Sequence, residues 1–239
     1  MFNRKSYKEI AKKQLKGRYT TPVLVTLVIA LITAVLGLPG FIEAFKSGSY
    51  NAITSHNGFY FSSEYTAPET YSLLITLITL FITGVLEIAE TNLYVTLSRT
   101  TEKISFSTFI KGFSLWLKGF LGYLWMALWI FLWSLLFFIP GIVKSFSYSQ
   151  MFFILVEHPN VGVRKAMRLS KEMTRGFKGD LFVMYLSFIG WNILALCTCG
   201  ILFLWLIPYQ NMAFTNAYHA LKARAINTNV LHAEDFETN

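Results

Sequence analysis

Residues 120–139 read FLGYLWMALWIFLWSLLFFI and contain no charged side chain. A helix needs about 20 mostly apolar residues to cross the roughly 30 Å hydrocarbon core of a bilayer, so this stretch predicts a transmembrane helix. The composition of the whole chain agrees, because 54% of the 239 residues are hydrophobic and only 14% are charged. Soluble domains carry about 25% charged residues. Two cysteines and 17% aromatic residues exclude a disulfide scaffold and a disordered chain.

Five further apolar runs accompany this stretch, so the sequence predicts an all-α, polytopic membrane protein of about six transmembrane helices arranged as three hairpins. The five runs cover residues 22–45, 71–97, 142–156, 181–196 and 201–220. Two of them, 142–156 and 181–196, are only about 15 residues long. For these two, a full crossing and a re-entrant segment remain alternatives.

The basic residues predict how the spans are oriented. The six apolar runs, 120–139 included, are numbered in chain order. Of the 21 Lys and Arg residues, 19 lie before run one, between runs two and three, between runs four and five, or after run six. Only Lys46 and Lys144 lie on the other side. The positive-inside rule then predicts a multi-pass protein of the cell membrane with both termini in the cytoplasm. The net charge of +8 reflects this topology and attraction to anionic lipids, so we expect no nucleic-acid partner.

A basic segment precedes each predicted hairpin and ends in Lys-Gly, where the glycine is expected to bend the chain into the membrane. Within each segment the apolar residues recur at steps of three, four and seven, which places them on one face of a helix. We expect three interfacial helices on the inner leaflet, at residues 1–17, 101–119 and 161–179. The predicted contacts with anionic lipids are Lys12, Lys16, Lys111, Lys118, Arg164, Lys165, Arg168, Lys171 and Lys178.

The chain is predicted to form a single membrane domain over residues 1–239. The hairpins are expected at 22–97, 120–157 and 180–224, with an external loop at 46–70 and a tail at 225–239. No segment outside the bilayer is long enough for a catalytic domain.

Motifs of known catalytic or metal chemistry do not occur in the sequence. The four histidines are scattered, and Cys197 and Cys199 supply only half of a structural zinc site. There is no phosphate-binding glycine loop and no Gly-x-Ser-x-Gly elbow. We therefore expect no enzymatic activity, no cofactor and no metal.

Polar residues inside the predicted spans are better candidates for function, because a charge in hydrocarbon is costly and usually faces a partner or water. Glu87 and Glu90 share one face of a helix and are expected to meet a Lys or Arg near the cytoplasmic boundary. Lys144 is expected to meet Glu43. Either these side chains join helices by hydrogen bonds or they line a path for a solute or ion. The candidates are Glu87, Glu90, Lys144, Gln150, Asn192, Gln210 and Asn211.

Several motifs in the second half of the chain resemble a known family. They are IPGIVKS at 139–145, the turn Glu157-His158-Pro159, AMRLS at 166–170 and LWLIPY at 204–209. This pattern resembles the bacterial integral membrane family catalogued as domain of unknown function 975. The chain departs from it at 152–157, which read FFILVE where the family often has Pro-Tyr-Ile-Leu-Ala-Asp. The resemblance implies a multi-span membrane protein without an assigned reaction, and it supplies no active-site residues.

Three functions are consistent with this pattern. The leading hypothesis is a non-enzymatic scaffold or a module that binds lipid or a membrane-protein partner, including a second copy of itself. The alternative is a permease or a subunit for small-solute transport, and the third is an intramembrane lipid-modifying enzyme that uses Glu87 and Glu90. A water-accessible cavity through the polar residues would favour transport, whereas a dry, tightly packed bundle would favour the scaffold.

Overall fold

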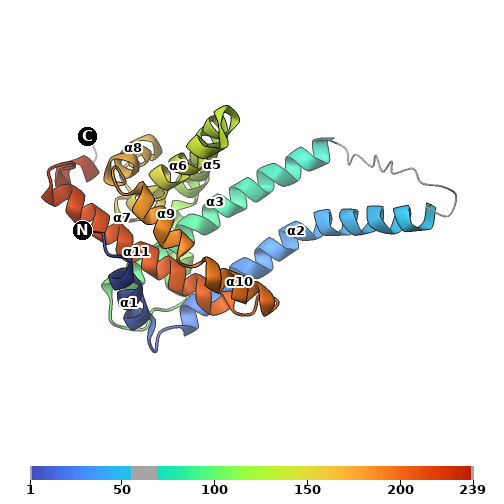
Figure 1. Cartoon of the computed structure of the whole chain (residues 1–239), viewed down its shortest axis with the longest axis horizontal. Coiled ribbons are helices and arrows are strands. Elements are labelled where there is room, and N and C mark those ends of the chain that lie inside the picture. Colours follow the sequence, from blue (N-terminus) through green and yellow to red (C-terminus); the bar gives the residue numbers. More distant parts are fainter. Residues whose placement is uncertain (1, 55–68, 238–239) are drawn as a thin grey trace.

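A computed structural model describes residues 2–54 and 69–237, and within these ranges the chain is helical and has no strand (Figure 1). The α-helices in chain order are α1 (Arg4–Leu15), α2 (Thr20–Thr54), α3 (Glu69–Arg99), α4 (Ser107–Gly112), α5 (Trp116–Leu136), α6 (Phe138–Tyr148), α7 (Met151–Glu157), α8 (Val163–Met173), α9 (Lys178–Leu186), α10 (Ile189–Cys197) and α11 (Phe203–Asn227). Short 3-10 helices cover Phe113–Leu115 and Ala233–Phe236.

Five helical segments of the described residues are long and apolar enough to cross a membrane, as expected of a membrane protein. They are Thr20–Leu38, Leu73–Arg99, Ser107–Leu136, Ile139–Glu157 and Lys178–Cys197. They coincide with the first five predicted runs. The sixth run forms most of α11, which is not among these segments, so the predicted count of six is not confirmed. The physical reason is that α11 carries polar residues that face other helices.

The surface of the five segments is strongly apolar. In α5 alone, Leu128, Phe131 and Leu135 are exposed, and 75% of the surface of Leu135 is accessible. Exposed leucines also follow one another along α2 and the first half of α3. An apolar surface of this extent is unfavourable in water and favourable in a bilayer, so these faces are the ones we assign to lipid.

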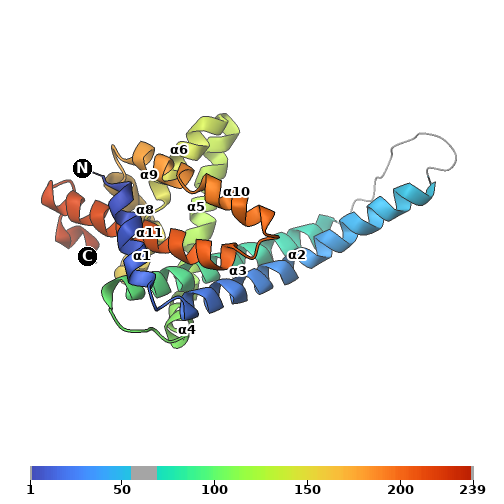
Figure 2. The same cartoon turned by 60° about the horizontal axis from the view of Figure 1, so that its bottom comes forward.

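Helix α11 lies at the centre of the protein core. It packs against α1, α2 and α3, and Figure 2 shows α1 lying across it. Met212, Ala213, Ala217 and Tyr218 are fully buried at these contacts. Alanine at two of the positions lets neighbouring backbones approach closely, which is how helices associate within membranes.

Helices α3 and α5 cross in close contact through glycines (Figure 2). A Cβ atom added to Gly119 of α5 would lie 2.6 Å from the carbonyl oxygen of Gly84. The neighbouring α4 also approaches α3 closely, because a Cβ atom added to Gly112 would lie 2.5 Å from Cα of Ala89. Gly119 was expected to bend the chain between an interfacial helix and a span. Instead it lies inside α5, because its missing side chain makes room for α3.

The predicted boundaries need three further corrections. Residues 46–54 of the expected external loop continue α2, and 55–68 lie outside the described residues. The expected interfacial helix at 101–119 is not separate, because residues 107–136 form one apolar helical segment. The third expected bend is at Gly176, where φ is +84°, rather than at Gly179.

The basic helices α1 and α8 bury their apolar faces against protein. Ala11 and Leu15 of α1 are fully buried beside α11, and Ala166 and Met173 of α8 are fully buried as well. The apolar faces on which the prediction of interfacial helices rests are therefore occupied by contacts with protein. Figure 1 shows α1, α8 and the last turns of α11 at the end of the molecule opposite the tip of α2.

Candidate functional site

Two of the predicted polar residues pair with α11. Asn211 donates a hydrogen bond from Nδ2 to Oε1 of Glu90, at 2.7 Å, and so joins α11 to α3. Gln210 donates from Nε2 to Oδ1 of Asn192, also at 2.7 Å, and joins α11 to α10. These pairs explain why α11 is polar where a lipid-facing span would be apolar: it connects two candidate membrane segments by hydrogen bonds.

A polar cavity of about 80 Å³ lies beside the Asn211–Glu90 pair. Glu87 is exposed at this cavity, Glu90 is half-buried, and Tyr94 is buried. No Lys or Arg of the described residues lies within ion-pair distance of either glutamate, so the predicted basic partner is wrong. The cavity is lined by Glu87, Glu90, Thr91, Tyr94, Phe153, Asn211, Phe214 and Thr215.

The other two predicted polar residues lie elsewhere. The ammonium group of Lys144 lies 4.2 Å from the ring centre of Trp133, while the side chain of its expected partner, Glu43, lies outside the described part. Gln150 donates from Nε2 to Oγ of Ser149, at 2.7 Å, and its backbone N–H donates to Oγ of Ser170 in α8. The seven candidates therefore do not form one site.

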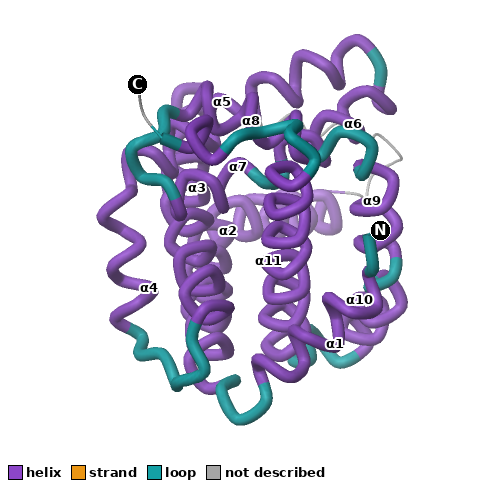
Figure 3. Tube along the Cα trace, turned by 90° about the vertical axis from the view of Figure 1, so that its left-hand side faces the viewer, coloured by secondary structure: helices purple, strands orange, loops and turns teal. Residues whose placement is uncertain are grey.

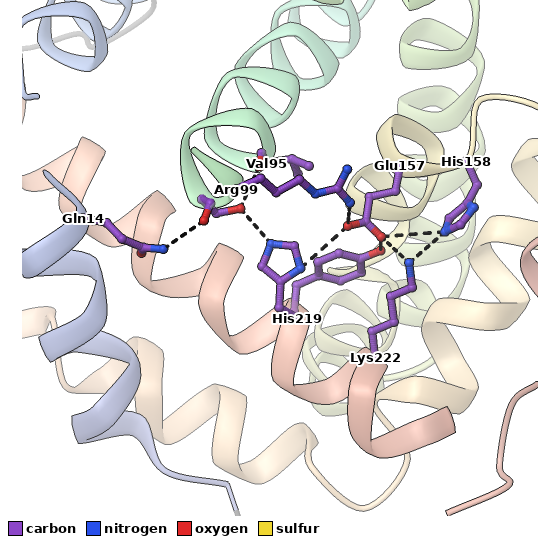
Figure 4. Close-up of polar contacts among 9 residues, drawn as sticks. Gln14, Val95, Arg99, Glu157, His158, His219 and Lys222 are labelled. Atoms are coloured by element: carbon purple, nitrogen blue, oxygen red, sulfur yellow. Dashed lines mark hydrogen bonds and ion pairs between the residues drawn. The ribbon is translucent and has the colours of Figure 1, made fainter. Parts of the chain in front are cut away.

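A cluster of charged residues surrounds Glu157 at the end of α7 (Figure 4). The side chain of Glu157 is only 2% exposed. Its Oε1 accepts a hydrogen bond from Arg99 of α3, and its Oε2 accepts from Lys222 and from the hydroxyl of Tyr218, the latter at 2.6 Å, both in α11. Three helices are thus held together at one buried carboxylate. We name Arg99, Glu157, Tyr218 and Lys222 the Glu157 cluster.

Two histidines border the Glu157 cluster. Lys222 donates a hydrogen bond to Nε2 of His158, at 2.8 Å, which requires that this ring nitrogen be unprotonated. Burial first, and then the nearby Lys222 ammonium, lower the pKa of His158. His219 bonds to Oγ of Ser98, at 2.8 Å, and Ser98 donates to the Val95 carbonyl. A hydroxyl has one proton to donate, so Nε2 of His219 is the donor in that contact.

A basic and apolar groove runs between the N-terminal part of α1 and the first turns of α9. Two adjoining cavities of about 450 and 430 Å³ make up this groove. The N-terminus lies beside α9 (Figure 3). Lys8 is fixed here, because it donates to the carbonyl oxygen of Ser187, at 3.2 Å, and lies 3.8 Å from the ring centre of Phe188. We name it the α1–α9 groove; its lining residues include Arg4, Lys5, Lys8, Phe182, Val183 and Leu186.

The electrostatics of the groove favour an anion. Arg4, Lys5 and Lys8 lie on one side, and Asp180 is the one acidic residue in the lining. Burial first, and then the charge of Arg4, lower the pKa of Lys8. A bound anion would relieve this repulsion. The apolar side chains of Phe182 and Val183, which are about 40% exposed, supply a surface for hydrocarbon beside the charges.

None of the predicted lipid contacts lines the α1–α9 groove. Lys12 lines a separate, mostly aromatic cavity of about 290 Å³ with Trp191 and Trp205. Lys118 and Lys165 instead donate to backbone carbonyls, and Arg164 lies over the ring of Trp125. The remaining predicted contacts lie apart from the groove: Lys16, Lys111, Arg168 and Lys171 are exposed and Lys178 is half-buried.

Sequence reasoning missed Arg4, Lys5 and Lys8 as site residues. The signal was the spacing of Arg4, Lys5 and Lys8, which places all three on neighbouring positions of one helix face. The Glu157 cluster was missed as well, although Glu157 had been singled out as part of an acid-x-Pro turn.

One protein-family model matches most of the chain. The family model described as "Protein of unknown function (DUF975)" matches residues 1–147 and 138–225. No curated protein and no solved structure matches the chain.

Proposed function

The chain belongs to the DUF975 family of proteins of unknown function, and we propose that it is a non-enzymatic protein of the cell membrane that binds anionic phospholipid in the α1–α9 groove. The observation that carries this proposal is the juxtaposition of Arg4, Lys5 and Lys8 with Phe182, Val183 and Leu186 in two adjoining cavities. A phospholipid has the same two-part chemistry, with an anionic phosphate next to acyl chains.

The position of the groove along α9 supports a lipid as the occupant. The fifth candidate membrane segment begins at Lys178. Val183 and Leu186 lie about 8 and 12 Å further along a helix that rises 1.5 Å per residue. Arg4 and Lys5 would therefore meet the phosphate at the membrane surface, and the apolar residues would meet the acyl chains below it.

The distribution of charge supports a cytoplasmic position for this end of the protein. Of the 21 basic residues, 19 are in the segments assigned to one side, which the positive-inside rule places in the cytoplasm. The inner leaflet is also where anionic lipids attract basic segments, at about 1 kcal/mol for each Lys or Arg near the surface. In this proposal the groove adds a defined site to that general attraction.

Binding of phosphatidylglycerol to the full chain in detergent tests the proposal, with phosphatidylcholine as the neutral lipid for comparison. Replacing Arg4→Gln and Lys5→Gln together should weaken phosphatidylglycerol binding by about 30-fold, from roughly 2 kcal/mol of lost attraction. Lys8 is left unchanged because it also holds α1 on α9. Native mass spectrometry can count the lipid retained.

The matched control is Lys13→Gln with Lys103→Gln. Both lysines are exposed and lie outside the groove. Replacing them removes the same amount of charge as replacing Arg4 and Lys5. The control should change phosphatidylglycerol binding by less than about threefold. Equal losses in the two variants would mean that the basic surface attracts lipid without a site, and would contradict the proposal.

A further inference from the structure

We propose that the polar cavity between α3 and α11 binds a monovalent cation, with Na⁺ as the representative ion. This site is separate from the α1–α9 groove and does not depend on lipid binding. The coordinating groups would come from Glu90, Tyr94, Asn211 and Thr215, which line the cavity.

The charge of the cavity calls for a positive partner. Glu87 and Glu90 both lie inside the candidate membrane segment Leu73–Arg99. In an apolar medium a carboxylate stays ionised only beside a counter-charge, and otherwise it takes up a proton. None of the ion pairs formed by the described residues includes either glutamate. A cation in the cavity would supply the missing counter-charge.

The hydroxyl of Tyr94 is a second, independent sign of a ligand. Tyr94 is 1% exposed, and its hydroxyl oxygen completes no hydrogen bond with the described residues, with the Thr26 hydroxyl and the Asn211 amide as its nearest polar neighbours. It lines the cavity and is close enough to Glu90 to interact with it electrostatically. Buried polar groups in native proteins are normally satisfied by protein, water or an ion. A cation coordinated by the Tyr94 oxygen would satisfy this group.

The other oxygens are also free to face an ion. Asn211 uses Nδ2 to bind Glu90, which leaves its Oδ1 as an acceptor. Thr215 donates its proton to the backbone carbonyl of Asn211, at 2.8 Å, so the lone pairs of its hydroxyl oxygen remain available. The cavity therefore presents carboxylate, hydroxyl and amide oxygens, the ligands that hard cations prefer.

A single positive charge fits the site better than a transition metal or a divalent ion. No group of three or more His, Cys, Asp or Glu able to hold a metal occurs in the part of the chain that the structure describes. Only Glu90 is half-buried in the cavity, while Glu87 is exposed at its edge. One inner carboxylate surrounded by neutral oxygens balances one charge.

Thermal unfolding of the full chain in detergent tests this proposal, with NaCl compared with choline chloride at equal ionic strength. Because a ligand that binds only the folded state stabilises it, saturating Na⁺ should raise the Tm by about 5 °C or more. Glu90→Gln should abolish the rise. Tyr94→Phe keeps the ring and should shift the Na⁺ concentration at half-effect upward by about tenfold. Glu102→Gln, an exposed carboxylate beyond α3, is the control and should behave as the unchanged protein.

Several results would overturn the proposal. Equal Tm values in NaCl and choline chloride would do so, as would a Na⁺ effect that survives in both Glu90→Gln and Tyr94→Phe. Stabilisation by Ca²⁺ or Mg²⁺ but not by Na⁺ would replace the monovalent site with a divalent one. Stabilisation by acidification alone would show that protons neutralise the two carboxylates. If Glu90→Gln does not fold, the response of Tyr94→Phe decides the outcome.

Discussion

Replacing Glu157 with Gln tests whether the Glu157 cluster holds α3, α7 and α11 together. The Glu157 side chain is 2% exposed, and the Lys222 side chain is 19% exposed. Glutamine would leave the charge of Lys222 without a carboxylate partner and would replace one of the two acceptor oxygens shared by Arg99, Lys222 and Tyr218 with an NH₂ donor. Breaking a buried ion pair by removing one partner costs about 3–5 kcal/mol. We expect the low end, about 3 kcal/mol, because Arg99 is 55% exposed and can return to water.

For a chain of this length, 3 kcal/mol corresponds to a fall in Tm of about 6–12 °C. Thermal unfolding in detergent measures it, and Glu172→Gln is the matched control. Within the described ranges Glu172 forms an ion pair only with Arg175, at 3.7 Å, and the Arg175 side chain is 81% exposed. An exposed pair of this kind contributes less than about 1 kcal/mol. A Tm for Glu157→Gln within about 2 °C of the control value would refute the reasoning.

Three other predictions follow from the fold. Gly119→Ala should lower the free energy of unfolding by about 1–3 kcal/mol, because the new Cβ would meet the α3 backbone. Gly179→Ala, where a Cβ would have no atom within 4 Å, should lower it much less. Thermal unfolding compares the two variants, and equal losses of stability would contradict the tight crossing of α3 and α5. Burial first, and then nearby Lys222, lower the pKa of His158 from its ordinary value of 6.5. The unfolded state therefore binds more protons than the folded state below pH 6.5, and the free energy of unfolding should fall as the pH drops from 7 to 5. His158→Gln should flatten this pH profile, and an unchanged profile would contradict the role given to His158. In a chain whose native cysteines are replaced by serine, Lys171→Cys should react with an impermeant thiol reagent only from the cytoplasm and Ser49→Cys only from outside; labelling of both from one side would contradict the topology.

Much of the helical pattern could be predicted from the sequence, because apolar length is a local property. The runs at 71–97 and 120–139 appear as long apolar helical segments in the structure. The sixth run is different because Gln210 and Asn211 sit in it. Whether such amides break a span or join helices depends on what lies opposite, and Glu90 and Asn192 come from distant parts of the chain.

Features that depend on close approach could not be predicted. Gly119 was interpreted as a bend because the local sequence, Lys-Gly after a basic segment, suggested one. Its role follows from Gly84 on another helix, which the local sequence does not indicate. The same holds for turns: Gly176 adopts a left-handed conformation, while Gly179, the expected bend, does not.

The candidate sites were predicted least well, for the same reason. In the Glu157 cluster, Arg99 lies 58 residues before Glu157 and Lys222 lies 65 residues after it. The α1–α9 groove joins residues about 180 positions apart, as the Lys8–Ser187 bond shows with a separation of 179. Sequence spacing identified which helix faces are basic, but not which apolar surface each face meets.

The most direct test of the proposed lipid site is an experimental structure of the full chain in a nanodisc that contains phosphatidylglycerol. We expect density for one phospholipid in the α1–α9 groove, with its phosphate within hydrogen-bond distance of Arg4 or Lys5 and an acyl chain against Val183 and Leu186. The same lipid should be absent from the groove in the variant with Arg4→Gln and Lys5→Gln. A groove filled by protein side chains, or occupied equally by phosphatidylcholine, would contradict the account.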